Sequence, residues 1–385
     1  MKKATGKKKT AWGQYIGLGF FVLIGAACGV IMMAHMDACM HAGRTLGETL
    51  PEVALLIAGM YAAIAAQLIL HEAGHLAFGL MTGYRFCSFR VFSLIWVKIG
   101  GRIRLRRLSI AGTGGQCLMA PPEMKNGKIP VTLYNLGGSI LNLLTGAAAL
   151  AAFSAAPQGM GAALLLVTAA VGLGIALMNG IPLHMGVMDN DGMNVVTLRR
   201  DAEAMRSFWI QMKVNELQTQ GVRLRDMPEA WFALPEKMDD AMTAALGVLA
   251  CNRLMDAHQF DAAAALMARM TRCTAMAGVH RAMMACDMEY IALITRGKAA
   301  QETARTAAQQ KIMKQMKDFP SVLRIEYACA LLKEGDRAGA ERIRARFEKL
   351  AGRYPYPGDV QSERELMDIA ARAALEKADE YAIME

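Results

Sequence analysis

Residues 53–81 read VALLIAGMYAAIAAQLILHEAGHLAFGLM, an apolar run that carries His71-Glu72-Ala73-Gly74-His75 near its end. About 20 apolar residues let a helix cross a bilayer, so this run predicts a membrane span. Two imidazoles four residues apart share one helix face and can bind one metal ion, with Glu72 beside the open position of that metal. Ionisable side chains are costly inside a membrane and mark functional sites. The run therefore predicts a metal site within the bilayer.

Three more apolar runs predict spans over residues 15–36, 131–153 and 161–182, which makes about four transmembrane helices. Five lysines precede the first run. That run is longer than the core of a secretory signal and has no small-residue cleavage site, so we expect a retained helix. The chain is thus expected to be mainly α and polytopic.

Charge is unevenly distributed along the chain. Residues 1–186 hold 15 Lys/Arg against 5 Asp/Glu, and residues 187–385 hold 28 against 29, so the net charge of +9 comes from the membrane half. The segments outside the expected spans alternate between basic and charge-poor, which orients both termini towards the cytosol of a multi-pass cell-membrane protein. Because this rule accounts for the basic surplus, no nucleic-acid partner is expected.

The basic segment 83–130 has a hairpin pattern. Residues 85–99 are rich in Phe, Val, Ile and Trp, Gly100-Gly101 forms a turn, and residues 102–110 alternate basic with apolar side chains. A lone hairpin is marginal in water, so we expect this one to lie on the membrane surface, with a solvated basic loop as the alternative. Residues 112–122 are too rich in Gly and Pro to predict regular structure.

A catalytic zinc ion needs three protein ligands and one open position, so His71 and His75 need a partner at the same depth. The eight cysteines form no CxxC pair that would suggest a cysteine zinc site. The fourth span ends at Asn179-Gly180-Ile181-Pro182 and returns the chain to the cytosolic side. Just after it, the candidate third ligands are His184, Asp189 and Asp191.

Together these motifs resemble the site-2 proteases, the intramembrane zinc metalloproteases. The resemblance covers residues 50–195 and rests on HEAGH in a membrane helix, GGSILN at 137–142 in the next, and NGIP at 179–182 followed by NDG at 190–192. It implies that Zn²⁺ is bound by His71, His75 and Asp191, that Glu72 is the catalytic base, and that Asn142 and Asn179 orient substrate or water. Eight residues separate Pro182 from Asp191, where the family usually has fewer, so Asp189 stays open as the third ligand.

The C-terminal half contains a weak repeat with a period of about 38–39 residues. Its copies at 254–266, 293–304 and 331–343 each read as a helix, a short break and an Ala-rich helix. This period predicts a cytosolic tetratricopeptide-like stack, and an ordinary helical bundle is the alternative. We expect a membrane domain over residues 1–192, a connecting helix and linker over 193–235, and the repeat domain over 236–385.

The expected function is hydrolysis of peptide bonds in or near the membrane spans of proteins or signal-peptide remnants. The lipid bilayer is then a partner, and the C-terminal helices could bind a cytosolic protein. An edge of the hairpin could hold an extended substrate segment by strand addition. The rival from another class is a non-catalytic membrane scaffold that recruits a cytosolic partner through its repeats. Metal transport is less favoured, because the first and third spans lack a convincing set of ionisable residues.

Overall fold

A computed structural model describes residues 10–110, 113–185, 188–296 and 305–384. The chain divides into two compact units. The first comprises Met1–Arg85 and Lys128–Ala202, and the second comprises Phe86–Gly127 and Glu203–Glu385. Residues 86–127 therefore group with the C-terminal helices, whereas the sequence-based division placed them in the membrane domain. Ile95, Val97 and Leu108 of this segment are buried in one apolar cluster with Tyr290.

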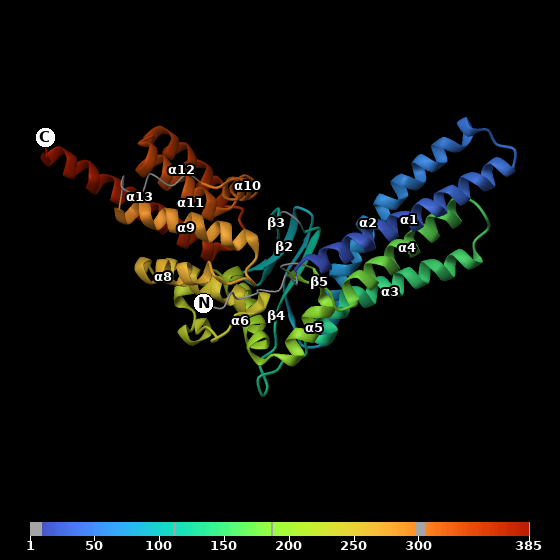
Figure 1. The fold of residues 1–385 in the computed structure, drawn as a ribbon, viewed down its shortest axis with the longest axis horizontal. Coiled ribbons are helices and arrows are strands. Elements are labelled where there is room, and N and C mark those ends of the chain that lie inside the picture. Colours follow the sequence, from blue (N-terminus) through green and yellow to red (C-terminus); the bar gives the residue numbers. More distant parts are fainter. Residues whose placement is uncertain (1–9, 111–112, 186–187, 297–304, 385) are drawn as a thin grey trace, which may run out of the picture. The chain divides into compact units, whose positions relative to one another are not determined.

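The first unit is built on four helices that run side by side (Figure 1). Each is long and apolar enough to cross a membrane, which confirms the expected number of candidate spans. The helices are α1 (Thr10–His41), α2 (Leu46–Met81), α3 (Thr132–Ala155) and α4 (Met160–Gly180). A two-stranded ribbon of β5 (His184–Met185) and β6 (Met188–Asp189) and the helix α5 (Asp191–Arg200) follow α4.

Helix α2 is the longest of the four and has a defined start. Thr45 accepts a hydrogen bond from the backbone N–H of Glu48, whose side chain accepts one from the backbone of Thr45, so the pair forms a capping box. Farther along, Gly74 packs against Gly137 of α3, and a Cβ at position 137 would lie 2.5 Å from the carbonyl oxygen of Gly74. The absence of side chains here lets the two backbones approach closely and brings the histidine face of α2 onto α3.

The second unit begins with a four-stranded sheet in the order β3-β2-β1-β4. Its strands are β1 (Arg85–Val91), β2 (Leu94–Ile99), β3 (Arg102–Arg107) and β4 (Gly115–Ala120). Strands β2 and β3 pair antiparallel from Ile99↔Arg102 onward, and Gly100 and Gly101 both have positive φ. The Gly-Gly turn was thus correctly predicted.

Two expectations for this segment were wrong. Residues 85–99 form two strands rather than one, because the chain reverses at Phe92, which has φ 52°. The buried Arg90 stabilises this reversal by donating a hydrogen bond to the carbonyl oxygen of Phe92 at 2.7 Å. The stretch 112–122 was expected to be irregular, yet it contains β4. A neighbouring strand supplies the backbone partners of β4, which no local pattern of Gly and Pro reveals.

The rest of the second unit is helical. Its helices are α6 (Ala202–Thr219), α7 (Ala241–Asp256), α8 (Phe260–Met270), α9 (Gly278–Arg296), α10 (Ala307–Gln315), α11 (Pro320–Cys329), α12 (Arg337–Ala351) and α13 (Pro357–Met384). Short 3-10 helices occur at η1 (Leu224–Asp226) and η2 (Glu229–Phe232), and a π-helical segment, η4 (Ala330–Glu334), continues α11. One apolar cluster joins the sheet to α7–α13, so the hairpin is not isolated but packs on a helical core.

Two of the breaks in the predicted repeat separate helices that contact each other. His258 has φ 58° between α7 and α8, and Gly335 has φ 70° between α11 and α12. The break at Gly297 and the residues up to Ala304 lie outside the described residues. Helix–break–helix pairs are therefore present, whereas their stacking in a tetratricopeptide-like array stays a prediction.

Candidate metal centre

Helix α2 places His71 and His75 on one face, as their spacing requires. Their Nε2 atoms lie 3.2 Å apart, and both side chains are buried. Gly138 of α3 makes room for the first ring, because a Cβ there would lie 2.6 Å from its Nδ1 and Cε1 atoms. The two imidazoles are therefore fixed against α3 with their Nε2 atoms directed at a shared centre.

Asp191, the first residue of α5, supplies a third donor atom to this centre. Its Oδ2 lies 3.0 Å from Nε2 of His71 and 3.5 Å from Nε2 of His75. Gly192 lets the start of α5 lie against the end of α4, since a Cβ at this position would overlap the carbonyl oxygen of Gly180. His71, His75 and Asp191 form a group whose ligand atoms all lie within 4.8 Å of one another.

The other nitrogen of each imidazole is occupied. Nδ1 of His75 lies 2.8 Å from the carbonyl oxygen of Tyr134, which can only accept a hydrogen bond. Nδ1 of His71 lies 2.8 Å from Oδ1 of Asn142. The amide of Asn142 is oriented by Gln67, because its Nδ2 donates to the backbone and side-chain oxygens of Gln67 at 2.8 and 2.7 Å. Both neutral imidazoles therefore carry their proton on Nδ1 and present a lone pair on Nε2.

Three lone pairs thus converge on one point. Oδ2 of Asp191 is buried and has no hydrogen-bond partner among the described residues. A positive charge at the centre, from a metal ion or from protonation of one imidazole, would satisfy this oxygen. Ligand atoms of a tetrahedral zinc ion, at about 2.0–2.2 Å from the metal, lie roughly 3.3–3.5 Å apart. The observed separations of 3.0, 3.2 and 3.5 Å lie within about 0.3 Å of these values.

Glu72 lies on the same turn of α2 as the two histidines. It is only partly buried, and its charge lies close enough to His75 to interact with it. Two imidazoles and one carboxylate leave a fourth position of a tetrahedral metal for water or substrate, as in catalytic zinc sites. The residue types and their arrangement suit water activation by a metal with a nearby carboxylate base.

The two candidate aspartates occupy different environments. Oδ1 of Asp189 lies 2.7 Å from Nδ1 of His184, the third candidate ligand, across the β5–β6 ribbon. Asp191 alone of these three belongs to the group formed with the α2 histidines in the described part of the chain. The geometry therefore favours Asp191 as the third ligand, whereas Asp189 and His184 pair with each other.

The two asparagines also differ. Asn142 makes hydrogen bonds to His71 and Gln67, so its contacts position a histidine rather than a substrate. Nδ2 of Asn179 donates to the carbonyl oxygen of Ile175 on its own helix at 3.1 Å. In the described part of the chain, the amide oxygen of Asn179 makes no hydrogen bond to His71, His75 or Asp191.

The sequence did not predict roles for Gln67, for the carbonyl of Tyr134 or for Asn190 beyond its place in the NDG motif. Asn190 caps α5 by accepting from the backbone of Met193, and its Nδ2 donates to the carbonyl oxygens of Met178 and Ile181 at 2.7 and 2.6 Å. These bonds fix the residue that precedes Asp191. Gln67 could have been noticed as a polar residue one helical turn before His71 within an apolar run.

A second group of possible ligands joins α1 to α2 and contains His35, Cys39 and Glu52. In this group the side chain of Arg44 supplies the positive charge, because its Nη1 lies 2.6 Å from Oε1 of Glu52 and 3.6 Å from Sγ of Cys39. The arginine neutralises the carboxylate, so this group reads as an ion-pair network that closes the α1–α2 loop.

The two sites therefore differ in what their donor atoms lack. At His71, His75 and Asp191 no positively charged side chain of the described residues reaches the centre. We conclude that this cluster is the candidate metal centre of the first unit. Comparison of the chain with protein-family models, curated proteins and solved structures finds no match.

Proposed function

We propose that this chain is an intramembrane zinc metalloendopeptidase of the site-2 protease type. The observation that carries the proposal is the convergence of one donor atom each from His71, His75 and Asp191, with Glu72 on the same helical turn. Helix α2, which carries both histidines, and helix α3, which packs against them, are long and apolar enough to cross a membrane. The motifs shared with site-2 proteases support the same reading.

The residues of the chain divide the work of peptide hydrolysis between them. Bound zinc supplies Lewis-acid polarisation of a carbonyl and lowers the pKa of a bound water from 15.7 to about 7. Glu72 takes a proton from the water that attacks the scissile carbonyl and returns it to the leaving amine. Asn142 holds the ring of His71 in the tautomer that presents Nε2. Membrane-spanning proteins or signal-peptide remnants are the substrates, and a helical substrate must unwind locally to expose its peptide bond.

The sheet of the second unit offers two surfaces for this function. Trp96 pairs with Leu105 and Lys98 with Ile103, so these side chains share one face, on which the apolar members are exposed. An apolar face with basic residues suits anionic lipid headgroups. In a variant that keeps Trp96 as its only tryptophan, brominated lipids should quench the fluorescence; unquenched emission would contradict membrane contact.

Strand β3 lies at one edge of the sheet and can accept an extended substrate strand by backbone hydrogen bonding. Proline substitutions in β3 should then reduce cleavage and leave the zinc content unchanged. Full cleavage by such variants would remove this part of the proposal. The charge pattern of the loops further supports cytosolic termini, which a fluorescent-protein fusion at residue 385 would report.

The decisive experiment uses the full chain purified in detergent. Metal analysis should give about one zinc per chain, and both His71→Ala and Asp191→Asn should abolish it. Glu72→Gln should keep the zinc and lose proteolysis of native membrane proteins, measured as new peptide termini by mass spectrometry. Absence of zinc from the wild type would instead favour the non-catalytic scaffold, in which a protonated imidazole pairs with Asp191.

A further inference from the structure

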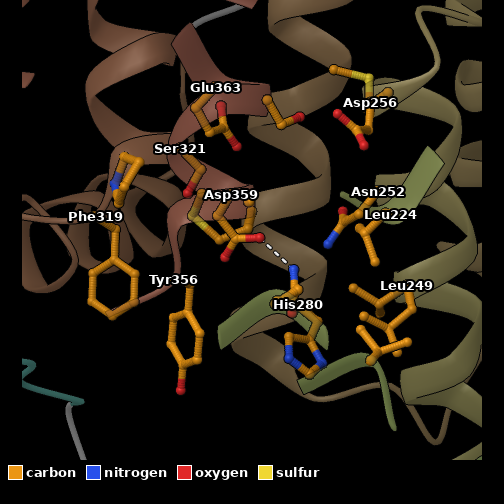
Figure 2. A pocket seen from close by; sticks show the side chains of 18 of the residues that line it. Leu224, Leu249, Asn252, Asp256, His280, Phe319, Ser321, Tyr356, Asp359 and Glu363 are labelled. Carbon is orange, nitrogen blue, oxygen red and sulfur yellow. Dashed lines mark hydrogen bonds between the residues drawn. The ribbon is translucent and has the colours of Figure 1, made fainter. Parts of the chain in front are cut away.

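The second unit contains a cavity of about 480 Å³ that is distinct from the candidate metal centre (Figure 2). Its walls come from the sheet and from α6, α7, α9, α11 and α13. Cavities of roughly 300–1,000 Å³ are typical of small-ligand sites. Its lining contains aromatic and apolar side chains, among them Phe319 and Tyr356, together with carboxylates and amides. The cavity therefore has both the size and the mixed lining of a binding site.

Most of the acidic side chains in the wall have cationic partners. Asp256 lies 2.5 Å from Arg223, which does not itself line the cavity. Asp287 and Glu363 share Arg324 at 2.6 and 2.8 Å. These carboxylates are thus already committed to ion pairs in the free protein.

Asp359 is the exception. No ion pair joins it to a Lys or Arg among the described residues, and its Oδ1 instead accepts a hydrogen bond from the side-chain amide of Gln218. The charged neighbours that act on it are the carboxylates Glu363 and Asp256. Burial, reinforced by these like charges, raises the pKa of Asp359 to about 7. Figure 2 shows Asp359 at the centre of the labelled side chains. A cation entering the cavity would relieve this concentration of negative charge.

Arg324 adds a second, independent feature. It lines the cavity, is 2% exposed, and its guanidinium lies over the ring of Tyr290 at 4.4 Å. Its Nη1 atom has no hydrogen-bond partner in the described part of the chain. An unpaired buried donor is costly, and a carbonyl or carboxylate oxygen would satisfy it. The wall therefore lacks one cation and one hydrogen-bond acceptor.

We propose that this cavity binds a lysine or arginine residue, with Asp359 as the counter-ion of its side chain and Arg324 as the donor to its carbonyl oxygen. The amides of Asn215 and Asn252 in the wall can pair with peptide groups. Phe319 and Tyr356 can pack against the alkyl or guanidinium part of the side chain. The same chemistry is offered by a free basic amino acid and by a basic residue within a peptide.

A peptide source follows if the chain is the membrane protease proposed above, on which this step rests. Segments that flank membrane spans on the cytosolic side are enriched in Lys and Arg. A cavity selective for these residues in a cytosolic unit would recognise the flank of a substrate. The catalytic centre does not enter the binding test, so binding and proteolysis can fail separately.

The test is calorimetric titration of the full-length Glu72→Gln protein in detergent. This variant is used because it cannot cleave a peptide ligand during the titration if Glu72 is the catalytic base. The probes are Nα-acetyl-arginine amide, free arginine, and Nα-acetyl-citrulline amide, which keeps the shape and loses the charge. The arginine amide should bind at least tenfold more tightly than the citrulline amide. Asp359→Asn should remove that preference, whereas Asp261→Asn, at an exposed carboxylate on α8, should keep it.

The outcomes separate the two sources. Tighter binding of a Lys/Arg-containing tetrapeptide than of free arginine supports peptide recognition. Tighter binding of free arginine supports a free amino acid as the ligand, and it overturns only the inference that the cavity recognises the flank of a substrate. Equal affinity for the arginine and citrulline probes, or unchanged affinity in Asp359→Asn, would overturn the proposal. Circular dichroism of each variant checks that loss of binding is not loss of fold.

Discussion

The imidazole of His71 lies against Gly138 so closely that a Cβ on the glycine would stand 2.6 Å from two of its ring atoms. Helix α3 therefore restricts the ring of His71, which α2 carries, and so helps to fix the direction in which Nε2 points. We expect Gly138→Ala to displace the ring and lower zinc occupancy of the purified protein by more than half. Gly25→Ala is the matched control, because nothing lies within 4 Å of a Cβ at that position of α1. Equal zinc content in both variants would contradict the positioning role of Gly138.

Asn142 should tune metal affinity without contacting the metal. Asn142→Leu removes the acceptor for Nδ1 of His71, so zinc affinity should fall about 10–100-fold in competition with a chelator. Asn142→Asp keeps an acceptor oxygen at this position and should restore part of the affinity. If Asn142→Leu and Asn142→Asp weaken zinc binding equally, then Asn142 does not act through its hydrogen bond to His71.

The third ligand can be assigned by two parallel substitutions. Asp191→Asn should abolish zinc binding, because Oδ2 of Asp191 lies 3.0 Å from Nε2 of His71. Asp189→Asn should leave zinc content near that of the wild type, since its carboxylate pairs with His184. X-ray absorption at the zinc edge measures both occupancy and ligand type. Loss of zinc in the Asp189 variant alone would reverse the assignment.

Glu72 should affect the rate of cleavage rather than metal binding. A positioned general base contributes about 10²–10⁴-fold to a hydrolytic rate, so kcat of Glu72→Gln should fall by this order or more. Zinc content should stay unchanged, because the three donor atoms come from other residues. A variant that retains both its zinc and its cleavage rate would show that another group takes the proton.

Asp359 should make the second unit less stable as pH rises. Its pKa in the folded chain is raised to about 7 from 3.8, so between pH 4 and 7 the unfolded chain releases a proton that the folded chain keeps. The free energy of unfolding therefore decreases over this range. We expect Asp359→Asn to raise this free energy by about 1–3 kcal/mol at pH 8 and to change it little at pH 4.

The measurement is hydrogen exchange in α13 at both pH values, because α13 carries Asp359. The charged or titratable side chains that share this cavity wall are Glu363, Asp256, Asp287, His280, Arg324, Tyr354 and Tyr356. Burial raises the pKa of Glu363 as well, although Arg324 opposes this shift. Burial lowers the pKa of His280. These groups keep some pH dependence in the variant, so the test is the difference between wild type and variant. No difference at pH 8 would contradict an ionised, unpaired Asp359.

Much of the architecture is encoded locally. The four candidate spans follow from the length and hydropathy of each run, which depend only on neighbouring residues. The β2–β3 turn follows from Gly100-Gly101, because both positions need a backbone conformation that glycine adopts freely. Strand β4 could not be predicted, because its stability comes from pairing with β1 rather than from its own residues.

The candidate metal centre shows the same division. By itself the sequence determined that His71 and His75 share a helix face with Glu72 between them, since helical periodicity is a local property. Only the tertiary structure distinguished Asp191 from Asp189, brought Asn142 and the carbonyl of Tyr134 to the histidines, and left Asp359 facing carboxylates. At the metal centre these relationships join residues far apart in the chain. They depend there on how closely helices pack at glycines such as Gly74 and Gly138, which no spacing within a single segment specifies.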